Sequence, residues 1–458
     1  MELGYLFTTI LKMVLLVAWI YGLMWGLNRK AIWQKALTIL LAFGVIQGAF
    51  LLQFGDYAVF SAFDQGLLYQ AVTMTMVALG LNLIYGFNGQ FSLAQWGFYG
   101  IGAYCAADIT YRWVNGDASG IFVAGIGVVL AALALVGVGR LLRLKRGIPV
   151  LSAFTFYLVA IVIVGFVAVF AGKALAAAVA PGFGAHGAGA LASPAAVQIV
   201  FFLSVLIAGA FAAEVSFLFG LPVLTLGSDY FGIATLGFAI VVQTLMVNSD
   251  TILPFPEMKG GRGMIGIPKL TSWVAAFAFL LVVVVIVRNF IRSSTGRATL
   301  SVREDETAAK AMGIDIAGSK LMAFVLGSFI AGIGGGVYAH YIGFLSPSTF
   351  SFIAGFNPLI IVVFGGLGSM TGSIAASFVW IFFLEGFLRV LLAQMGTEAP
   401  TWRFVLYPIT LLLLMLIRPQ GLLGSVEWGF LRPDKIIRRI TGNGASAPDS
   451  AAAQKGQA

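Results

Sequence analysis

The chain has 458 residues, of which 60% are hydrophobic and only 10% are charged, and its mean hydropathy is +0.99. Soluble domains carry about 25% charged residues, so this composition excludes a soluble protein and indicates a polytopic membrane protein. The net charge of +9 reflects the topology of the chain in the membrane and does not indicate nucleic-acid binding. The single cysteine excludes an internal disulfide, and two histidines are too few for a zinc site of the usual kind.

Apolar stretches long enough to cross a bilayer recur along the whole chain. A spanning helix needs about 20 mostly apolar residues. Apolar segments lie near 4–27, 34–54, 66–87, 91–109, 120–138, 149–176, 195–220, 229–248, 272–291, 319–340, 352–367, 371–393 and 404–418. We therefore expect an all-α polytopic membrane protein with about 11–13 apolar helical segments, some of them broken or re-entrant.

The basic residues predict how these segments are oriented. If the N-terminus lies outside and the segments alternate, most of the 27 Lys and Arg residues fall inside. They gather near residues 29–35, 140–146 and 288–320 and after residue 418. The positive-inside rule then predicts an N-out, C-in topology. The first segment is too long for a signal-peptide core, so we expect it to be retained.

Polar residues cluster where the third apolar segment ends and the fourth begins. They are Asn82, Asn88, Gln90, Ser92 and Gln95. Polar groups at membrane depth must be satisfied by protein or by a water-filled cavity. A turn that lines a translocation pathway is one interpretation, and interhelical hydrogen bonding is the alternative for each residue.

Asp229 precedes another apolar run. We interpret it as the cap of a helix N-terminus, where free N–H groups stabilise a carboxylate, in preference to a proton relay. It joins the candidate pathway residues.

A charged segment, residues 293–318, interrupts the apolar sequence. Arg303, Glu304, Asp305 and Glu306 are predicted to open a helix, whose dipole the acidic residues complement, and Gly313 to end it. The alanines at positions 308, 309 and 311 leave a surface of small side chains against which another protein can pack. The segment is either a docking helix or a solvated loop helix without a partner.

The sequence contains no recognisable catalytic constellation. The stretch GIDIAGSK, residues 313–320, lacks the lysine directly after the second glycine that a phosphate-binding loop requires. We therefore expect no enzymatic activity, and no metal or cofactor on this chain. If ATP is the energy source, it is bound with Mg²⁺ by a different chain.

The motif REDETAAKAMG, Arg303 to Gly313, is accompanied by further motifs in a fixed order. They are LNLIYGFNGQFSLAQWGFYGIGAY (81–104), GSDYFGIATLGF (227–238), GGRGMIGIP (260–268), VVFGGLGSMTGSIAA (362–376) and IRPQGLLG (417–424). Together they resemble the LivM-type permeases of branched-chain amino acid ABC transporters, a family that also includes LivH-like and urea or amide permeases. One departure is Arg262, where family members often have asparagine.

This resemblance implies a division of the chain. Residues 66–424 correspond to the permease core, and residues 1–65 are extra transmembrane helices. The stretch near 140–194 has no recognised counterpart and is expected to be an inserted helical pair. The charged segment 293–318 is expected to be cytoplasmic, and residues 425–458 form a basic and then disordered cytoplasmic tail.

The resemblance also implies a transport system in the bacterial cytoplasmic (inner) membrane. Its other components are two ABC ATPase subunits, a second homologous permease subunit and an extracytoplasmic solute-binding protein. The ATPases contact Arg303, Glu304, Asp305, Glu306, Ala308, Ala309 and Gly313 and drive inward movement of a small polar or zwitterionic solute by alternating access. No nucleic-acid partner is expected.

Two alternative functions remain open. A urea or short-amide permease of the same family shares these motifs. An ion-coupled secondary transporter working alone would use intramembrane charges, for which Glu214, Lys173 and Glu385 are the candidates. A bound ATPase discriminates between the two mechanisms. A membrane enzyme is a third, disfavoured reading.

Overall fold

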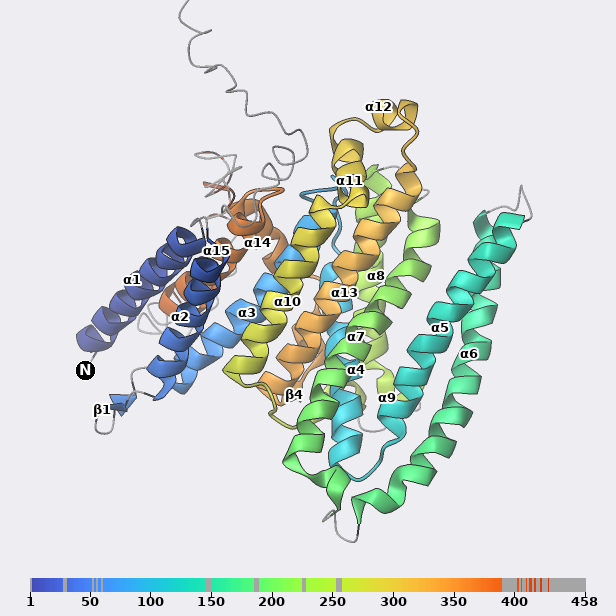
Figure 1. The fold of residues 1–458 in the computed structure, drawn as a ribbon, viewed down its shortest axis with the longest axis horizontal. Helices are drawn as coiled ribbons and strands as arrows, with labels where there is room; N and C mark the ends of the chain where they lie inside the picture. The colour runs from blue at the N-terminus through green and yellow to red at the C-terminus, as the bar shows by residue number, and fades with distance from the viewer. Residues whose placement is uncertain are drawn as a thin grey trace, which may run out of the picture.

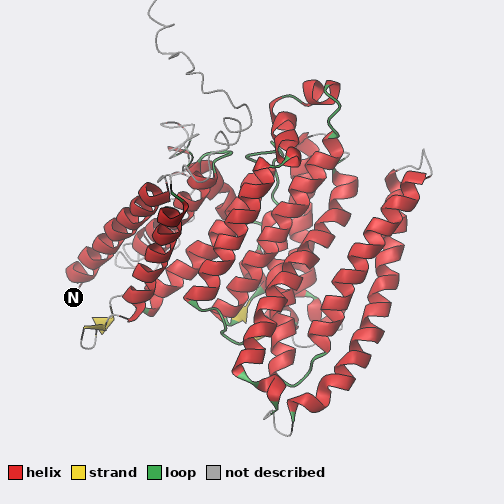
Figure 2. Ribbon diagram, in the orientation of Figure 1, coloured by secondary structure: helices red, strands yellow, loops and turns green. Residues whose placement is uncertain are grey.

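The fold is given by a computed structural model that describes most of the chain. It describes residues 2–27, 31–51, 53–54, 57–58, 61–144, 150–184, 189–224, 228–252 and 258–388, and single residues at 402, 405, 409, 412, 413, 416, 421 and 427. The described chain is almost entirely helical (Figure 2), with two short antiparallel pairs, β1 (Gln53–Phe54) with β2 (Tyr57–Ala58) and β3 (Met264–Ile265) with β4 (Phe344–Leu345). The predicted all-α class is confirmed.

The helices follow one another in chain order as labelled in Figure 1. The α-helices are α1 (Glu2–Leu27), α2 (Ile32–Leu51), α3 (Ala62–Ile84), α4 (Gln95–Val114), α5 (Ser119–Leu144), α6 (Val150–Val179), α7 (Pro194–Val223), α8 (Ser228–Val247), α9 (Ser249–Ile252), α10 (Trp273–Arg292), α11 (Ser294–Glu304), α12 (Glu306–Ala311), α13 (Ile316–Ile342), α14 (Phe356–Gly365) and α15 (Met370–Trp380). Short 3₁₀ turns are η1 (Ala180–Phe183), η3 (Ala190–Ala192), η5 (Gly260–Arg262) and η6 (Pro347–Phe350), and η7 (Ile381–Leu388) is a π-helix.

Eight helices among the described residues are long and apolar enough to cross a membrane. The chain is therefore a multi-pass membrane protein. The first twelve predicted apolar segments each correspond to a helix, and the thirteenth, 404–418, lies mostly outside the described residues. The N-out, C-in orientation stays a prediction.

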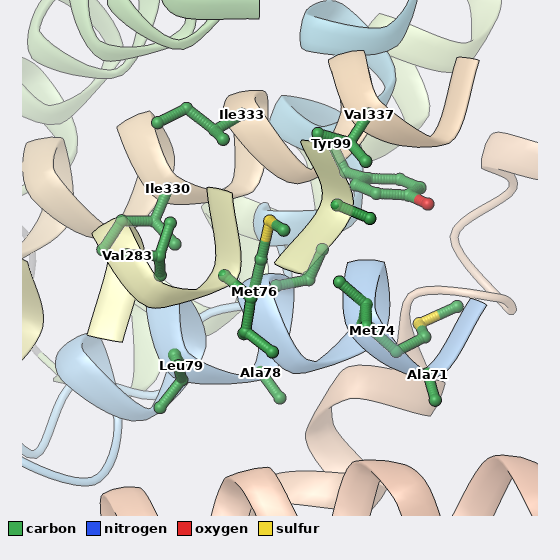
Figure 3. Close-up of a cluster of buried hydrophobic side chains, with 14 of the residues drawn as sticks. Ala71, Met74, Met76, Ala78, Leu79, Tyr99, Val283, Ile330, Ile333 and Val337 are labelled. Atoms are coloured by element: carbon green, nitrogen blue, oxygen red, sulfur yellow. The ribbon is translucent and has the colours of Figure 1, made fainter. Parts of the chain in front are cut away.

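The core forms where α13 packs against α3, α4 and α7. Figure 3 shows Met76 and Leu79 of α3, Tyr99 of α4 and Ile330 of α13 meeting there with side chains of α10. Lipid is as apolar as these side chains, so close packing rather than exclusion from water holds such helices together. Gly335 of α13 permits this closeness, because an added Cβ would overlap the Tyr99 carbonyl.

The helices α5 and α6 form a hairpin at one edge of the molecule (Figure 1). Only 6% of the apolar window of α5 and 11% of that of α6 are buried inside the chain, against 89% for α3. The hairpin therefore faces outward with an apolar surface. The inserted helical pair near 140–194 stays a prediction; α6 lies within that stretch, whereas α5 begins before it, at Ser119.

At the opposite edge, α1 and α2 attach through polar contacts. Lys12 of α1 forms a 2.5 Å ion pair with Asp64 of α3, whose carboxylate also completes a capping box with Ser61. The Trp19 indole N–H donates to the Ala42 carbonyl at 3.1 Å. The charge of Lys12 inside an apolar helix is thus neutralised by a partner on the core.

The apolar sequence near 352–388 forms a broken helix pair. Helix α14 has ten residues, or about 15 Å of rise, half of a typical hydrocarbon core. The chain turns at Gly366 (φ 111°) and Gly368 (φ 79°), conformations that favour glycine. Ser369 then caps α15 by accepting from the Gly372 N–H. We call residues 366–369 the helix break. The half-length helix α14 agrees with the prediction that some of the apolar segments are broken.

Candidate functional site

The charged segment is two helices separated at one residue. Helix α11 ends at Glu304, and Asp305 has an extended backbone (φ −159°, ψ 113°). The Asp305 carboxylate accepts from the N–H groups of Thr307 and Ala308 at 2.7 and 3.0 Å, so it caps α12. The predicted helix therefore starts later than expected. Arg303 and Glu304 end α11, because an extended cap residue cannot lie inside a helix.

Helix α12 presents an exposed face at one end of the molecule (Figure 1). Ala308 is exposed, whereas Ala309 is 3% exposed and faces the chain. Met312, directly after the helix, is 83% exposed, the largest value among the exposed large hydrophobic residues. Gly313 follows with φ 81° and ends the helix as predicted. Met312 was not predicted from the sequence, although an apolar residue beside a terminal glycine was a usable signal.

The other acidic residues of the segment also have partners within the chain. Glu306 Oε1 lies 2.5 Å from the ammonium of Lys320, on α13. This pair spans the turn between α12 and α13. The Glu304 carboxylate lies 3.7 Å from Arg303 Nε, in a longer ion pair, and its side chain is 77% exposed. Glu304 is therefore better placed than Glu306 to meet another chain.

Arg303, near the end of α11, has a partly exposed side chain that reaches the polar residues between α3 and α4. Its Nη1 donates to the Gly86 carbonyl at 2.5 Å. Gly86 belongs to the polar turn, residues 85–94 between α3 and α4. A Cβ added at Gly89 would lie 3.4 Å from Arg303 Cγ, and one at Gly368 would lie 2.7 Å from Nη1. The guanidinium thus lies between the polar turn and the helix break.

Asn82 joins α3 to the same helix break. It is fully buried. Its Nδ2 donates to the Ser369 carbonyl and to Ser373 Oγ, both at 2.9 Å, and its Oδ1 accepts from the Gly368 N–H at 2.9 Å. All of its amide contacts serve interhelical hydrogen bonding. These are the bonds of the alternative interpretation, and pathway lining by Asn82 stays a prediction.

Residues near the C-terminus complete the helix break. Glu427 accepts at 2.7 Å from the N–H of Met370 and at 2.6 Å from the hydroxyl of Thr371, so a carboxylate lies at the N-terminus of α15. Burial raises the pKa of the Glu427 carboxyl, while these hydrogen bonds oppose the shift. Gly421 packs directly against Gly366. Glu427 lies in the stretch predicted as a tail, and it contacts the core.

The remaining polar residues of the turn divide into paired and unpaired groups. Asn88 Nδ2 donates to Gln90 Oε1 at 2.6 Å, and the Ala94 N–H donates to Ser92 Oγ at 3.3 Å. Gln95 is 2% exposed, and neither its Nε2 nor its Oε1 has a hydrogen-bond partner among the described residues. The Asn88 Oδ1 is also buried without a partner in that part of the chain. Since buried polar groups are nearly always paired, these atoms indicate a functional or conformational role.

Asp229 lies in the first turn of α8, but its side chain is outside the described part, so its capping role stays a prediction. In the described residues, no three His, Cys, Asp or Glu side chains gather into a possible metal site. The expectation of no cofactor on this chain also stays a prediction.

Comparison with known proteins identifies a family. The family model for the permease component of branched-chain amino acid transport systems matches residues 128–416. That range includes the stretch near 140–194 and excludes residues 81–104. It does not test the division at residues 66 and 424. No solved structure matches the chain.

Individual relatives cover a smaller part of this chain than the family model does. The high-affinity branched-chain amino acid permease LivM of Escherichia coli is 32% identical over 252 residues, covering 47% of this chain and 56% of the relative. LivH of Salmonella typhimurium is 24% identical, covering 43% and 64%. A probable LivM of Methanocaldococcus jannaschii is 24% identical, covering 49% and 68%. The chain spans about half the length of the first of these relatives.

Proposed function

Because this chain belongs to the family of permease components of branched-chain amino acid transport systems, we propose that it is a permease subunit of an ATP-binding-cassette importer. It moves branched-chain amino acids inward by alternating access. Separate ATPase subunits bind and hydrolyse the ATP. The observation that carries the proposal is the family match over residues 128–416.

The ATPase partner docks on α12. The helix projects at one end of the molecule (Figure 1), and its outer face offers the small side chain of Ala308 and the large apolar side chain of Met312. A short helix of this kind fits into a groove, where an apolar anchor contributes most when it is fully covered. Glu304 supplies an exposed charge at the rim. Glu306 holds α12 to Lys320.

The solute passes the start of α4. Gln95 offers a donor and an acceptor, both buried and without partners in the described chain, and Asn88 offers an acceptor. A primary amide can bind a carboxylate through its N–H groups and an ammonium through its oxygen. Such groups suit a zwitterionic amino acid. They also suit urea, so the solute panel must contain both.

The remaining components follow from the same proposal. Two ATPase subunits, a second homologous permease subunit and an extracytoplasmic solute-binding protein complete the system in the bacterial inner membrane. With the N-terminus outside, the segments alternate so that α12 lies in the cytoplasm. The apolar outer surface of the α5–α6 hairpin faces lipid.

The first test is purification of the tagged chain from its native membrane, with mass spectrometry of the proteins that accompany it. The proposal expects two ATPase chains and a second permease, and ATP-dependent uptake of radiolabelled leucine by the reconstituted complex. Uptake of radiolabelled urea and not leucine assigns the amide branch of the family. Transport by the chain alone, driven by an ion gradient without ATP, overturns the proposal.

A matched pair of variants tests the docking surface. Ala308→Arg places a bulky charge on the outer face of α12 and should remove the ATPase chains from the purified complex. Ala190→Arg makes the same change at an exposed position of η3 and should leave the complex intact. Equal ATPase content in the two variants would contradict docking on α12.

A further inference from the structure

Among the residues predicted to contact the ATPase, Arg303 has a hydrogen bond that leads into the core. Its guanidinium donates to the carbonyl of Gly86, which is 217 residues earlier in the chain. That carbonyl lies just beyond the C-terminus of α3, where unsatisfied carbonyl groups carry partial negative charge. A guanidinium is well suited to this position because it is always charged and has several donors in one plane.

Three glycines form the surface on which Arg303 lies. They are Gly86, Gly89 and Gly368. A side chain at Gly368 would come within 2.7 Å of Arg303 Nη1, and one at Gly89 would touch the Arg303 stem. Gly86 and Gly89 belong to the polar turn, and Gly368 belongs to the helix break. One side chain therefore contacts both segments at once.

The connection from Arg303 to α12 is short and is held by hydrogen bonds. Asp305 lies between them, and its carboxylate is bonded to the first N–H groups of α12. On the other side, Asn82 ties the backbone of Gly368 and Ser369 to α3 through hydrogen bonds of 2.9 Å. A displacement of α12 thus reaches the polar turn and the helix break through a continuous series of direct contacts.

We infer that Arg303 is a positioning residue that transmits movement of α12 to the polar turn and the helix break, and that it is not a contact for the ATPase. This inference rests on the proposed function, because it requires that an ATPase moves α12. It assigns the docking role to Ala308 and Met312 and the transmission role to Arg303. The two roles predict different losses when each residue is changed.

The test compares Arg303→Ala with Arg297→Ala in the complete complex. Arg297 lies on the same helix, but its guanidinium donates only to the nearby Arg292 carbonyl in the described chain, at 2.8 Å. Each variant is purified with its partner chains and reconstituted in liposomes. The measurements are ATPase chain content, ATP hydrolysis and uptake of radiolabelled leucine, with radiolabelled urea in parallel.

Arg303→Ala should keep the ATPase chains and hydrolyse ATP, while solute moved per ATP falls roughly ten-fold, the effect of losing one charge-assisted hydrogen bond. Arg303→Lys retains a positive donor and should recover part of this ratio. Arg297→Ala should match the wild type. Uptake per ATP that is unchanged in Arg303→Ala overturns the inference.

The failures of the two ideas are distinguishable. If Arg303→Ala loses the ATPase chains, as Ala308→Arg should, then Arg303 is a docking residue and only the inference fails. If the wild-type chain purifies without any ATPase and transports with an ion gradient, the proposed function fails. If Arg303→Ala does not accumulate, Arg303→Lys is compared with Arg297→Lys, and equal ratios of solute to ATP overturn the inference.

Discussion

Asn82 and Ser369 are 287 residues apart in the chain, yet the Asn82 side-chain amide donates to the Ser369 carbonyl at 2.9 Å. The same amide oxygen accepts from the N–H of Gly368. The Gly368 N–H has its partner on α3, in Asn82 Oδ1. The Ser369 carbonyl accepts from the Ser373 N–H at the start of α15 and takes Asn82 as a further donor. Asn82 therefore bonds two backbone groups of the helix break from a different helix, so the conformation of the helix break depends on α3.

Asn82→Leu should destabilise the protein by about 3 kcal/mol, because three hydrogen bonds are lost and the half-buried Gly368 N–H loses its partner. The measurement is thermal unfolding in detergent. Asn248→Leu is the matched control, since among the described residues its side chain bonds only to the Thr244 carbonyl, in a solvent-exposed hydrogen bond at the end of α8. A midpoint for Asn82→Leu as high as that of the control would refute this role.

Gln95→Leu should have the opposite effect on stability. Its two polar atoms are buried without partners in the described chain, so an apolar replacement of similar size should stabilise the protein by about 1–2 kcal/mol. If Gln95 contacts the solute, uptake of radiolabelled leucine should fall roughly ten-fold at the same time. Higher stability with normal uptake would remove Gln95 from the pathway.

Gly86→Ala and Gly137→Ala should change the stability of the protein in opposite directions. An added Cβ at Gly86 would overlap Asn82 Oδ1 and the Gly368 backbone, whereas nothing lies within 4 Å of one at Gly137 in α5. Alanine inside an exposed helix is favoured over glycine by about 0.5–1 kcal/mol. We expect Gly137→Ala to raise the unfolding midpoint and Gly86→Ala to lower it. Two variants of equal stability would contradict the close approach at Gly86.

The Glu427 carboxyl makes stability depend on pH. Burial raises its pKa in the folded chain above the usual value of 4.5, so the folded chain binds this proton more tightly than the unfolded chain. The resulting contribution to stability is present below the unfolded pKa and is lost as pH rises through the raised folded pKa. Acidification from about pH 8 to about pH 5 should therefore raise the wild-type midpoint relative to that of Glu427→Gln. A difference that is constant, or that grows with rising pH, would show that ionised Glu427 is the stabilising form.

The lengths of apolar runs predicted most of the fold. Twenty or more apolar residues leave few alternatives to a helix in lipid, and α7, α10 and α13 lie where the sequence placed them. Gly313 was predicted correctly because a left-handed residue after a helix is nearly always glycine. These are local properties, and local sequence is sufficient to predict them.

The partners of Arg303, Asn82 and Glu427 could not be predicted in the same way. The Gly86 carbonyl is 217 residues from Arg303, and a backbone carbonyl carries no mark in the sequence. Glu427 lies in a stretch whose composition is typical of a tail, yet it caps a helix that begins 57 residues earlier. The break at Asp305 was missed because acidic residues are equally common at the cap and in the first turn of a helix.

The capping of α15 by Glu427 has a consequence for how the protein is made. Synthesis proceeds from the N-terminus, so α14 and α15 leave the ribosome before the carboxylate that binds the N-terminus of α15. Until residue 427 has been added, the Met370 and Thr371 N–H groups lack that acceptor. Assembly of the helix break is therefore among the last steps of biogenesis, and a chain cut short before residue 427 carries all the described membrane spans with their junction incomplete.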